Sequence, residues 1–284
     1  MITKEILFCR LLSKSIFFMV PTFQLYDMLT EEQKSFFNKN GFILFKNFIS
    51  KENVALFINE IEAVEKKLLS DDIEKINGVP LKFGQNSNGE KIIQRNAFVS
   101  LNSKILHEFL QDPRFKILTQ LLLPYEGRVG ENEKDGLVFN HYERTPSSTF
   151  TRMGWHTDSP RDLFLGQKIM PMLNVGVHLD DCAQSNGGLR VLPGTHKQKV
   201  FELLFRKKYF IDNTPDPNEV GFDIEAGDLT VHHGSLWHRV QESNKYGIES
   251  RRRVMYIPVV TGKCKPKTEN SKTPFYHRLK KVIN

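Results

Sequence analysis

The sequence is poor in cysteine and contains no internal repeats. Three cysteines, Cys9, Cys182 and Cys264, occur among 284 residues, and none has the C-x-x-C spacing of zinc ribbons or redox sites. An odd number of scattered cysteines argues against a disulfide framework and favours a reducing compartment. We therefore expect a cytoplasmic protein that is stabilised by a hydrophobic core rather than by cross-links.

Long apolar runs are also missing, even from residues 1–28, which differ most from the rest of the chain. Arg10 and Lys14 interrupt this segment, and no run approaches the roughly 18 apolar residues needed to cross a bilayer. The apolar core and small-residue cleavage site of a secretory signal are absent too. Two interpretations stay open: a segment that targets the protein to an organelle, or a start codon assigned too early, with the true start at Met19 or Met28.

Positive charge is unevenly distributed along the chain. The formal net charge is +7, but residues 263–284 alone carry seven Lys or Arg and one acidic residue. Residues 29–262 are therefore close to neutral. A solvated basic tail is the default interpretation, and no nucleic-acid-binding motif accompanies it. We expect a small-molecule substrate and no nucleic-acid partner; an adaptor that binds nucleic acid or membrane through the tail is the weaker alternative.

Hydrophobic periodicity predicts a helix-rich first half. Thr30 and the glutamates that follow it predict a helix over 29–40. Apolar residues recur at helical spacing over 50–69 and over 105–123, where Asp112-Pro113 breaks the pattern. The Gly- and Asn-rich stretch 77–93 is expected to be a loop that covers a pocket. The second half differs, because short strand-like runs alternate there with Gly, Pro and Asn turns, a pattern typical of a β-barrel or jelly roll.

These patterns predict one domain with two appendages. A chain of this length can bury one sizeable core. We expect an N-terminal extension (1–28), a single domain (29–262) and a basic C-terminal tail (263–284). Within the domain, a helix-rich flank (29–123) precedes the β core (137–262).

Two H-x-D triplets, His156/Asp158 and His178/Asp180, are candidate metal-binding motifs. In an extended segment, residues i and i+2 point the same way, so the His and Asp of such a triplet reach one metal ion. With a distant histidine, His238, they give two imidazoles and one carboxylate, the facial triad of non-haem Fe(II). Local context favours the first triplet, because Gly, Ser and Pro break its flanks, whereas the second ends an apolar strand-like run.

An arginine run, Arg251 to Arg253, follows His238 in the sequence. Three protein ligands leave about half of an octahedral Fe(II) shell vacant on one face. A 2-oxo acid chelates two of those positions, and dioxygen takes the last. A guanidinium fork matches the remote carboxylate of such an acid in two parallel hydrogen bonds.

Several ordered segments resemble the phytanoyl-CoA dioxygenase family. Residues 179–197, LDDCAQSNGGLRVLPGTHK, look like the family's signature segment. Residues 227–238, GDLTVHHGSLWH, resemble the segment that delivers the family's distal iron histidine, and residues 29–43 are similar to its first helix and strand. The likeness runs in order from about Leu29 to Thr261. It implies a double-stranded β-helix (jelly-roll) core and an Fe(II)- and 2-oxoglutarate-dependent oxygenase that uses O2 as a co-substrate.

The resemblance also implies roles for individual residues. The family's H-x-D precedes the signature segment, so the implied iron ligands are His156, Asp158 and His238. Arg252 best fits the family's 2-oxoglutarate arginine, with its two neighbours as register alternatives. Asn174 falls where some members place a polar 2-oxoglutarate contact. Because halogenating relatives replace the ligand carboxylate with a small residue, Asp158 favours hydroxylation of a small molecule or an acyl thioester.

One position departs from the family pattern. The family usually has serine two residues after the distal histidine, where this chain has Val240. Losing that hydroxyl removes one donor to the co-substrate, an effect of roughly 0.5–1.5 kcal/mol. The alternative that this departure favours is a jelly-roll protein that binds a metal or ligand without oxidising it.

Several neighbours of the implied ligands have no assigned role. His232 and His233 are adjacent, so in a strand they point to opposite faces and cannot both be ligands. For such residues, packing or hydrogen bonding is the default interpretation. Trp155 and Trp237 each precede an implied ligand, and two interpretations stay open for them: walls of the metal site, or ordinary core.

Overall fold

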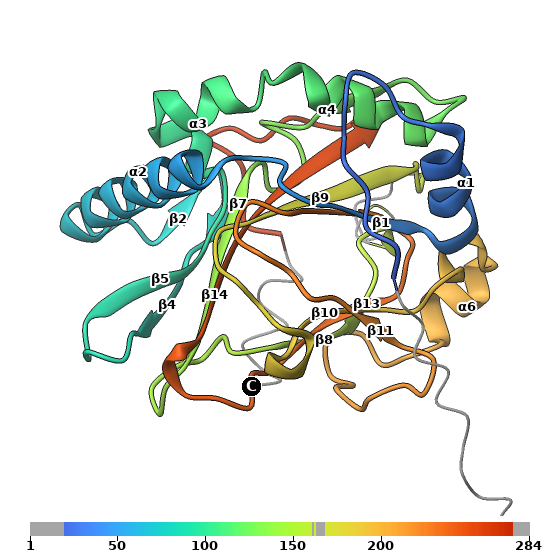
Figure 1. The fold of residues 1–284 in the computed structure, drawn as a ribbon. Coiled ribbons are helices and arrows are strands. Elements are labelled where there is room, and N and C mark those ends of the chain that lie inside the picture. Colours follow the sequence, from blue (N-terminus) through green and yellow to red (C-terminus); the bar gives the residue numbers. More distant parts are fainter. Residues whose placement is uncertain (1–19, 161, 163–167, 275–284) are drawn as a thin grey trace, which may run out of the picture.

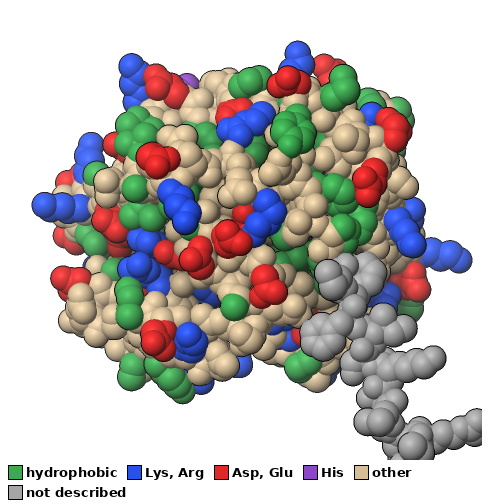
Figure 2. Space-filling model, in the orientation of Figure 1, with side chains coloured by type: hydrophobic (Ala, Val, Ile, Leu, Met, Phe, Trp, Pro, Cys, Tyr) green, Lys and Arg blue, Asp and Glu red, His purple; other side chains and the backbone are tan. Residues whose placement is uncertain are grey.

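The computed structural model describes residues 20–160, 162 and 168–274 (Figure 1). Residues 1–19 of the predicted extension and residues 275–284 of the predicted tail therefore lie outside the described residues. Within the described part of the chain, no helix is both long enough and apolar enough to span a membrane. Lys and Arg side chains are interspersed with Asp and Glu over the face drawn in Figure 2, in keeping with the near-neutral balance of residues 29–262.

The predicted helices form, with clear start signals. Helix α1 (Glu31–Asn40) begins at Thr30, which forms a capping box with Gln33, and ends at Gly41 in the left-handed conformation. Helix α2 (Lys51–Ser70) begins at Ser50 and buries one apolar stripe, Val54, Phe57, Ile61, Val64 and Leu68. The third predicted helical segment is divided into α3 (Lys104–Phe109), α4 (Pro113–Leu118) and the 3-10 turn η2 (Thr119–Leu122), because Pro113 starts a new helix capped by Asp112.

The expected loop at 77–93 is instead a hairpin. Strands β4 (Lys82–Gln85) and β5 (Lys91–Asn96) pair antiparallel and extend the main sheet. Its tip alone has turn chemistry, since the Asn86 side chain accepts hydrogen bonds from the backbone N–H groups of Asn88 and Glu90. Asn77 and Gly78 form a second tight turn just before the hairpin, and the prediction extended the signal of the two turns into the strands.

Two antiparallel sheets form the core. The larger one has eight strands, seven of them in the order β1-β12-β9-β14-β7-β5-β4, with β6 paired to β14; the smaller one has the order β11-β10-β13-β8. Their remaining bounds are β1 (Phe42–Phe45), β6 (Gly127–Val129), β7 (Val138–Arg144), β8 (Met153–His156), β9 (Met172–His178), β10 (Gly188–Val191), β11 (Val220–Gly221), β12 (Leu229–His233), β13 (His238–Gln241) and β14 (Gly247–Thr261). A separate ribbon pairs β2 (Lys75–Ile76) with β3 (Val79–Pro80). Helix α6 (Val200–Phe205) lies in the connection between β10 and β11.

Alternation along the central strands gives the eight-stranded sheet two different faces. Its outer face is apolar and packs with α2, α3 and α4, which cover it in Figure 1. Val175, Val231 and Ile257 belong to this main core. The residues between them point to the opposite face, which is lined by buried polar side chains such as His232 and Arg252. The inner face therefore carries the polar side chains that a binding site requires.

The buried carboxylate of Asp228 links the end of β1 to the start of β12. It is 0% exposed and accepts hydrogen bonds from Lys46 Nζ at 2.6 Å and from the backbone N–H groups of Asn47 and Glu225. These contacts hold the end of β1 against the start of β12. The family-like Gly227-Asp228 pair therefore has a structural role.

We expect Asp228→Ala to lower the free energy of unfolding by about 3 kcal/mol or more, because it leaves Lys46 and two backbone donors without their acceptor. Glu225→Ala is the matched control, since Glu225 also pairs with Lys46 but is 65% exposed, so its loss should cost less than about 1 kcal/mol. Urea unfolding measures both, and equal losses would contradict this role for Asp228.

Candidate metal centre

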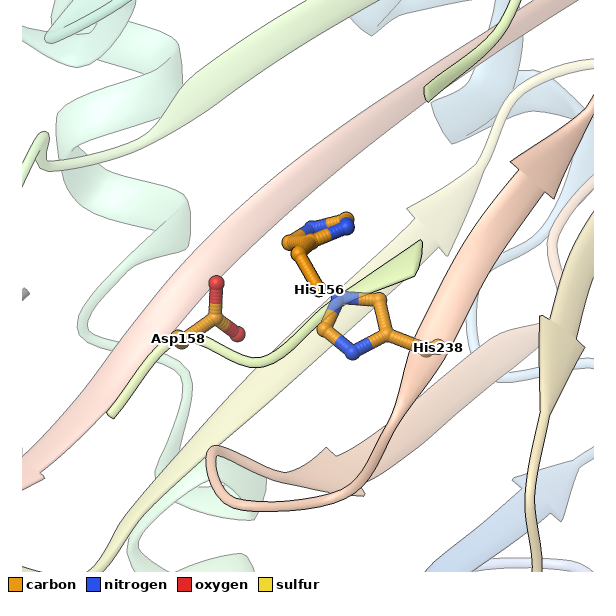
Figure 3. A group of neighbouring side chains, drawn as sticks. All are labelled: His156, Asp158 and His238. Atoms are coloured by element: carbon orange, nitrogen blue, oxygen red, sulfur yellow. The ribbon is translucent and has the colours of Figure 1, made fainter. Parts of the chain in front are cut away.

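His156, Asp158 and His238 meet between the two sheets. One ligand atom from each lies within 4.8 Å of the others. Figure 3 shows the three side chains grouped together. His156 ends β8 and His238 begins β13, and these two residues are direct partners in the antiparallel pairing. Asp158 follows two residues after His156, on the same side. Strand register thus brings together residues about eighty positions apart.

Hydrogen bonds fix which nitrogen of each histidine faces the centre. His156 Nδ1 lies 2.8 Å from the Gly154 carbonyl oxygen, and His238 Nδ1 lies 2.9 Å from that of Leu236. A carbonyl oxygen only accepts, so Nδ1 carries the proton in both rings and the lone pair is on Nε2. Backbone carbonyls orient metal-binding histidines in this way in other proteins. The set of metal-binding groups therefore consists of two imidazoles that turn Nε2 toward the centre and one carboxylate.

The loop after His156 positions the carboxylate. The Asp158 backbone N–H donates to the Gly234 carbonyl at 2.8 Å, and Asn174 Nδ2 donates to Asp158 Oδ2 at 3.3 Å. Asn174 lies on β9 in the eight-stranded sheet, so a strand of the facing sheet helps to hold the carboxylate.

The second H-x-D triplet forms different contacts. His178 Nε2 lies 3.0 Å from Thr230 Oγ1, and burial lowers the pKa of His178 to about 3. The Asp180 carboxylate accepts two hydrogen bonds from Arg253, at 2.8 and 2.9 Å. These two side chains pair with other partners. Within the described ranges, only His156, Asp158 and His238 form a group with metal-binding geometry.

The three consecutive arginines have different environments. Arg253 forms the paired hydrogen bonds with Asp180, and Arg251 Nε lies 3.9 Å from the same carboxylate. Arg252 points to the inner face, where it is 6% exposed and donates to the carbonyl oxygens of Gln241 and Thr151. Among the described residues no carboxylate pairs with Arg252, and its Nε has no hydrogen-bond partner. It is a buried cation with capacity for an anion.

Comparison with known protein families shows to which of them this chain belongs. The model of the family described as phytanoyl-CoA dioxygenase (PhyH) matches residues 37–245. The chain belongs to the phytanoyl-CoA dioxygenase family.

Curated relatives agree with this membership. An ectoine dioxygenase from Bordetella parapertussis is 27% identical over 218 residues, which cover 72% of this chain and 64% of that protein. The mouse peroxisomal phytanoyl-CoA dioxygenase is 25% identical over 228 residues, covering 75% and 63%. This family member thus spans slightly less than two thirds of the length of these relatives.

Solved structures share the fold at lower identity. EctD from S. alaskensis, determined with bound Fe, aligns with a TM-score of 0.61 at 15% identity and covers 88% of this chain and 83% of its own. SnoK, a non-haem alpha-ketoglutarate-dependent carbocyclase from nogalamycin biosynthesis, aligns with a TM-score of 0.61 at 16% identity, with coverages of 89% and 91%. The likeness confirms the predicted jelly-roll core.

Val240, where the family usually has serine, is part of an apolar cluster. It packs with Tyr142, Phe150 and Val254 on the inner faces of the two sheets. The Tyr142 ring stacks on Phe150 at 4.8 Å, and the Arg252 guanidinium lies 5.4 Å from the Tyr142 ring. In this member, an apolar wall therefore stands beside the arginine in place of a hydroxyl.

Sequence reasoning missed Phe210. Its ring stacks on His156 with centroids 4.7 Å apart, although it lies in the connection between β10 and β11, more than fifty residues along. Its φ of 62° is in the left-handed region, which is uncommon for an aromatic residue. Helix α6 ends at Phe205, and the residues that follow it reach the site. Only the folded structure reveals that Phe210 packs against a proposed metal ligand.

We expect Asp158→Ala to lose stoichiometric Fe2+ uptake, measured by anaerobic titration, because two imidazoles alone form an incomplete facial site. Asp180→Ala should retain it, since the Asp180 carboxylate binds Arg253 and not the triad. Thermal melting of both variants separates loss of the fold from loss of the ligand. Equal iron binding by the two variants would refute the assignment.

Proposed function

We propose that this chain is an Fe(II)- and 2-oxoglutarate-dependent dioxygenase that hydroxylates an unactivated carbon of a small molecule or an acyl thioester. The observation that carries the proposal is the cluster of His156, Asp158 and His238 in a family member. Their donor atoms fit Fe(II): two imidazole nitrogens with fixed lone pairs and one carboxylate. Bound iron would supply the activation of dioxygen, with 2-oxoglutarate as the reductant.

The proposed role of Arg252 is to bind the remote carboxylate of 2-oxoglutarate. Its burial and the absence of a carboxylate partner within the described chain support this choice. Its neighbours Arg251 and Arg253 are disfavoured, because Asp180 already lies against them. A guanidinium removed from water forms strong paired hydrogen bonds with a carboxylate.

Asn174 remains a proposed 2-oxoglutarate contact, next to its hydrogen bond with Asp158. An amide there is suited to hold the Asp158 carboxylate with one N–H while the second N–H donates to an oxygen of 2-oxoglutarate. The apolar cluster of Tyr142, Phe150, Val240 and Val254 would exclude water from the co-substrate, which strengthens each polar contact inside.

The substrate class follows from the relatives only in outline. The names of the curated relatives specify ectoine, phytanoyl-CoA and hypophosphite, so the family fixes the reaction better than the substrate. We propose a small-molecule substrate, one catalytic domain over residues 29–262, and a location in the cytoplasm. The two interpretations of residues 1–28 both stay predictions.

A second candidate function is a jelly-roll protein that binds a metal or ligand without oxidation, which Val240 favours. Release of labelled succinate from 2-oxoglutarate, with and without candidate substrates, distinguishes the two. Iron-dependent succinate release supports the dioxygenase. Stoichiometric iron binding without any such release would support the binding protein.

We expect Arg252→Met to raise the KM for 2-oxoglutarate by about tenfold to a hundredfold, since the lost contact is a charge-assisted pair of roughly 1.5–3 kcal/mol. Arg251→Met removes the neighbouring, partly exposed guanidinium and should leave this KM unchanged. Succinate release at varied 2-oxoglutarate concentrations measures both values. An equal rise in both variants would contradict the selective role of Arg252.

A further inference from the structure

His232 occupies an unusual position beside the triad. It lies on β12, is 1% exposed, and its ring centroid is 4.3 Å from that of His238. Its Nε2 lies 3.9 Å from Asp158 Oδ2, too far for a hydrogen bond. The ring therefore reaches the centre without pairing with any of the three proposed ligands.

Neither ring nitrogen of His232 has a hydrogen-bond partner among the described residues. Every other histidine described has at least one: His178 contacts Thr230, for example, and His233 Nδ1 accepts from the Ser235 backbone N–H. A buried imidazole with an unused donor and an unused acceptor is costly. Such a group indicates a ligand that completes its hydrogen bonds.

The ring also approaches the centre from the side opposite to two of the proposed metal ligands. His156 and His238 belong to the four-stranded sheet, and Asp158 follows directly after its strand β8. His232 projects from the facing eight-stranded sheet, where it is the register partner of Asn174. It is absent from the group that satisfies the metal-binding geometry. It therefore approaches the three proposed ligands from the facing sheet.

His232 and Arg252 lie far apart along the strand direction. Asn174 pairs with Pro258 on β14, which lies six positions after Arg252. At about 3.3 Å per residue, His232 and Arg252 lie about 20 Å apart along the strand direction, backbone to backbone. The two side chains span part of this separation, so a single carboxylate group is too small to contact both of them.

We propose that His232 is a hydrogen-bonding residue for the metal-binding end of 2-oxoglutarate, the end that carries the 2-oxo and adjacent carboxylate oxygens. The assignment rests on the proposed function. In it, a ring N–H donates to an oxygen of this end, and Arg252 binds the remote carboxylate. His232 positions the co-substrate and is not a fourth metal ligand.

The test is calorimetric titration of Mn2+-loaded protein, which binds ligands without turnover. His232→Phe keeps the ring size but removes both nitrogens, and we expect it to raise the Kd of 2-oxoglutarate about tenfold or more. The Kd of Mn2+ itself should stay within about twofold. His232→Gln, which retains a donor, should recover part of the affinity. His178→Gln is the matched control, since His178 is also buried on the inner face but bonds to Thr230.

A second ligand locates the contact. 2-Oxopentanoate has the same metal-binding end as 2-oxoglutarate but lacks the remote carboxylate. His232→Phe should weaken both acids by the same factor, whereas Arg252→Met should weaken 2-oxoglutarate alone. A His232→Phe effect confined to 2-oxoglutarate would overturn the proposed location.

The remaining outcomes are distinguishable. Unchanged 2-oxoglutarate affinity in folded His232→Phe refutes the role of His232 while leaving the proposed function intact. Weaker Mn2+ binding would make His232 a metal ligand and also refutes it. Failure of the unaltered protein to bind 2-oxoglutarate overturns the proposed function and this inference together. Should His232→Phe not fold, His232→Leu carries the same expectations.

Discussion

The register between β8 and β13 is the constraint on which the site depends. His156 and His238 are direct partners in this pairing, and a slip of one residue would turn one of them out of the barrel. The tryptophan that precedes each histidine opposes such a slip. Trp155 and Trp237 are 0% exposed and pack with Leu192 on the outer face of the small sheet.

Both indole groups are also held by hydrogen bonds. Trp155 Nε1 donates to the Thr214 carbonyl, and Trp237 Nε1 donates to Gln198 Oε1. Moving either strand by one residue would bury these donors unpaired and place an imidazole in the outer cluster. The sequence left two interpretations of these tryptophans open, walls of the metal site or ordinary core. Their burial in one apolar cluster makes them core residues. Their packing is nevertheless what directs the histidines inward.

The sequence was sufficient wherever local chemistry determines the outcome. Thr30 with Gln33, Ser50, and Asp112 before Pro113 all mark helix starts that form. The choice between two H-x-D triplets also agrees with the geometry, although it needed a family resemblance as well as spacing. What local patterns left undecided was the arginine register, because Arg252 differs from its neighbours only in the face to which it points.

Other features depend on contacts that no local pattern specifies. The approach of Phe210 to His156 requires a long connection to fold back over β8, and the β4–β5 hairpin pairs with β7 through Arg95 and Asn96. His232 is a further example, since its nearest neighbours come from β13 and from the loop after β8. In each case, distant strands supply the partner, so only the assembled barrel defines the environment of the residue.

The inner face combines unpaired polar atoms with an apolar wall, and this combination favours a bound ligand over water. Four buried polar atoms have no hydrogen-bond partner among the described residues: Arg252 Nε, both His232 ring nitrogens and Asn140 Oδ1. Each such atom lowers the stability of the fold. Val240, Val254 and the Phe150 ring make the same space unfavourable for ordered water, since they offer it no hydrogen bonds. A ligand that satisfies these atoms would therefore stabilise the fold as well as bind to it. The valine that replaces the family's serine need not weaken such a site, because the dry surroundings strengthen the charged contact that remains at Arg252.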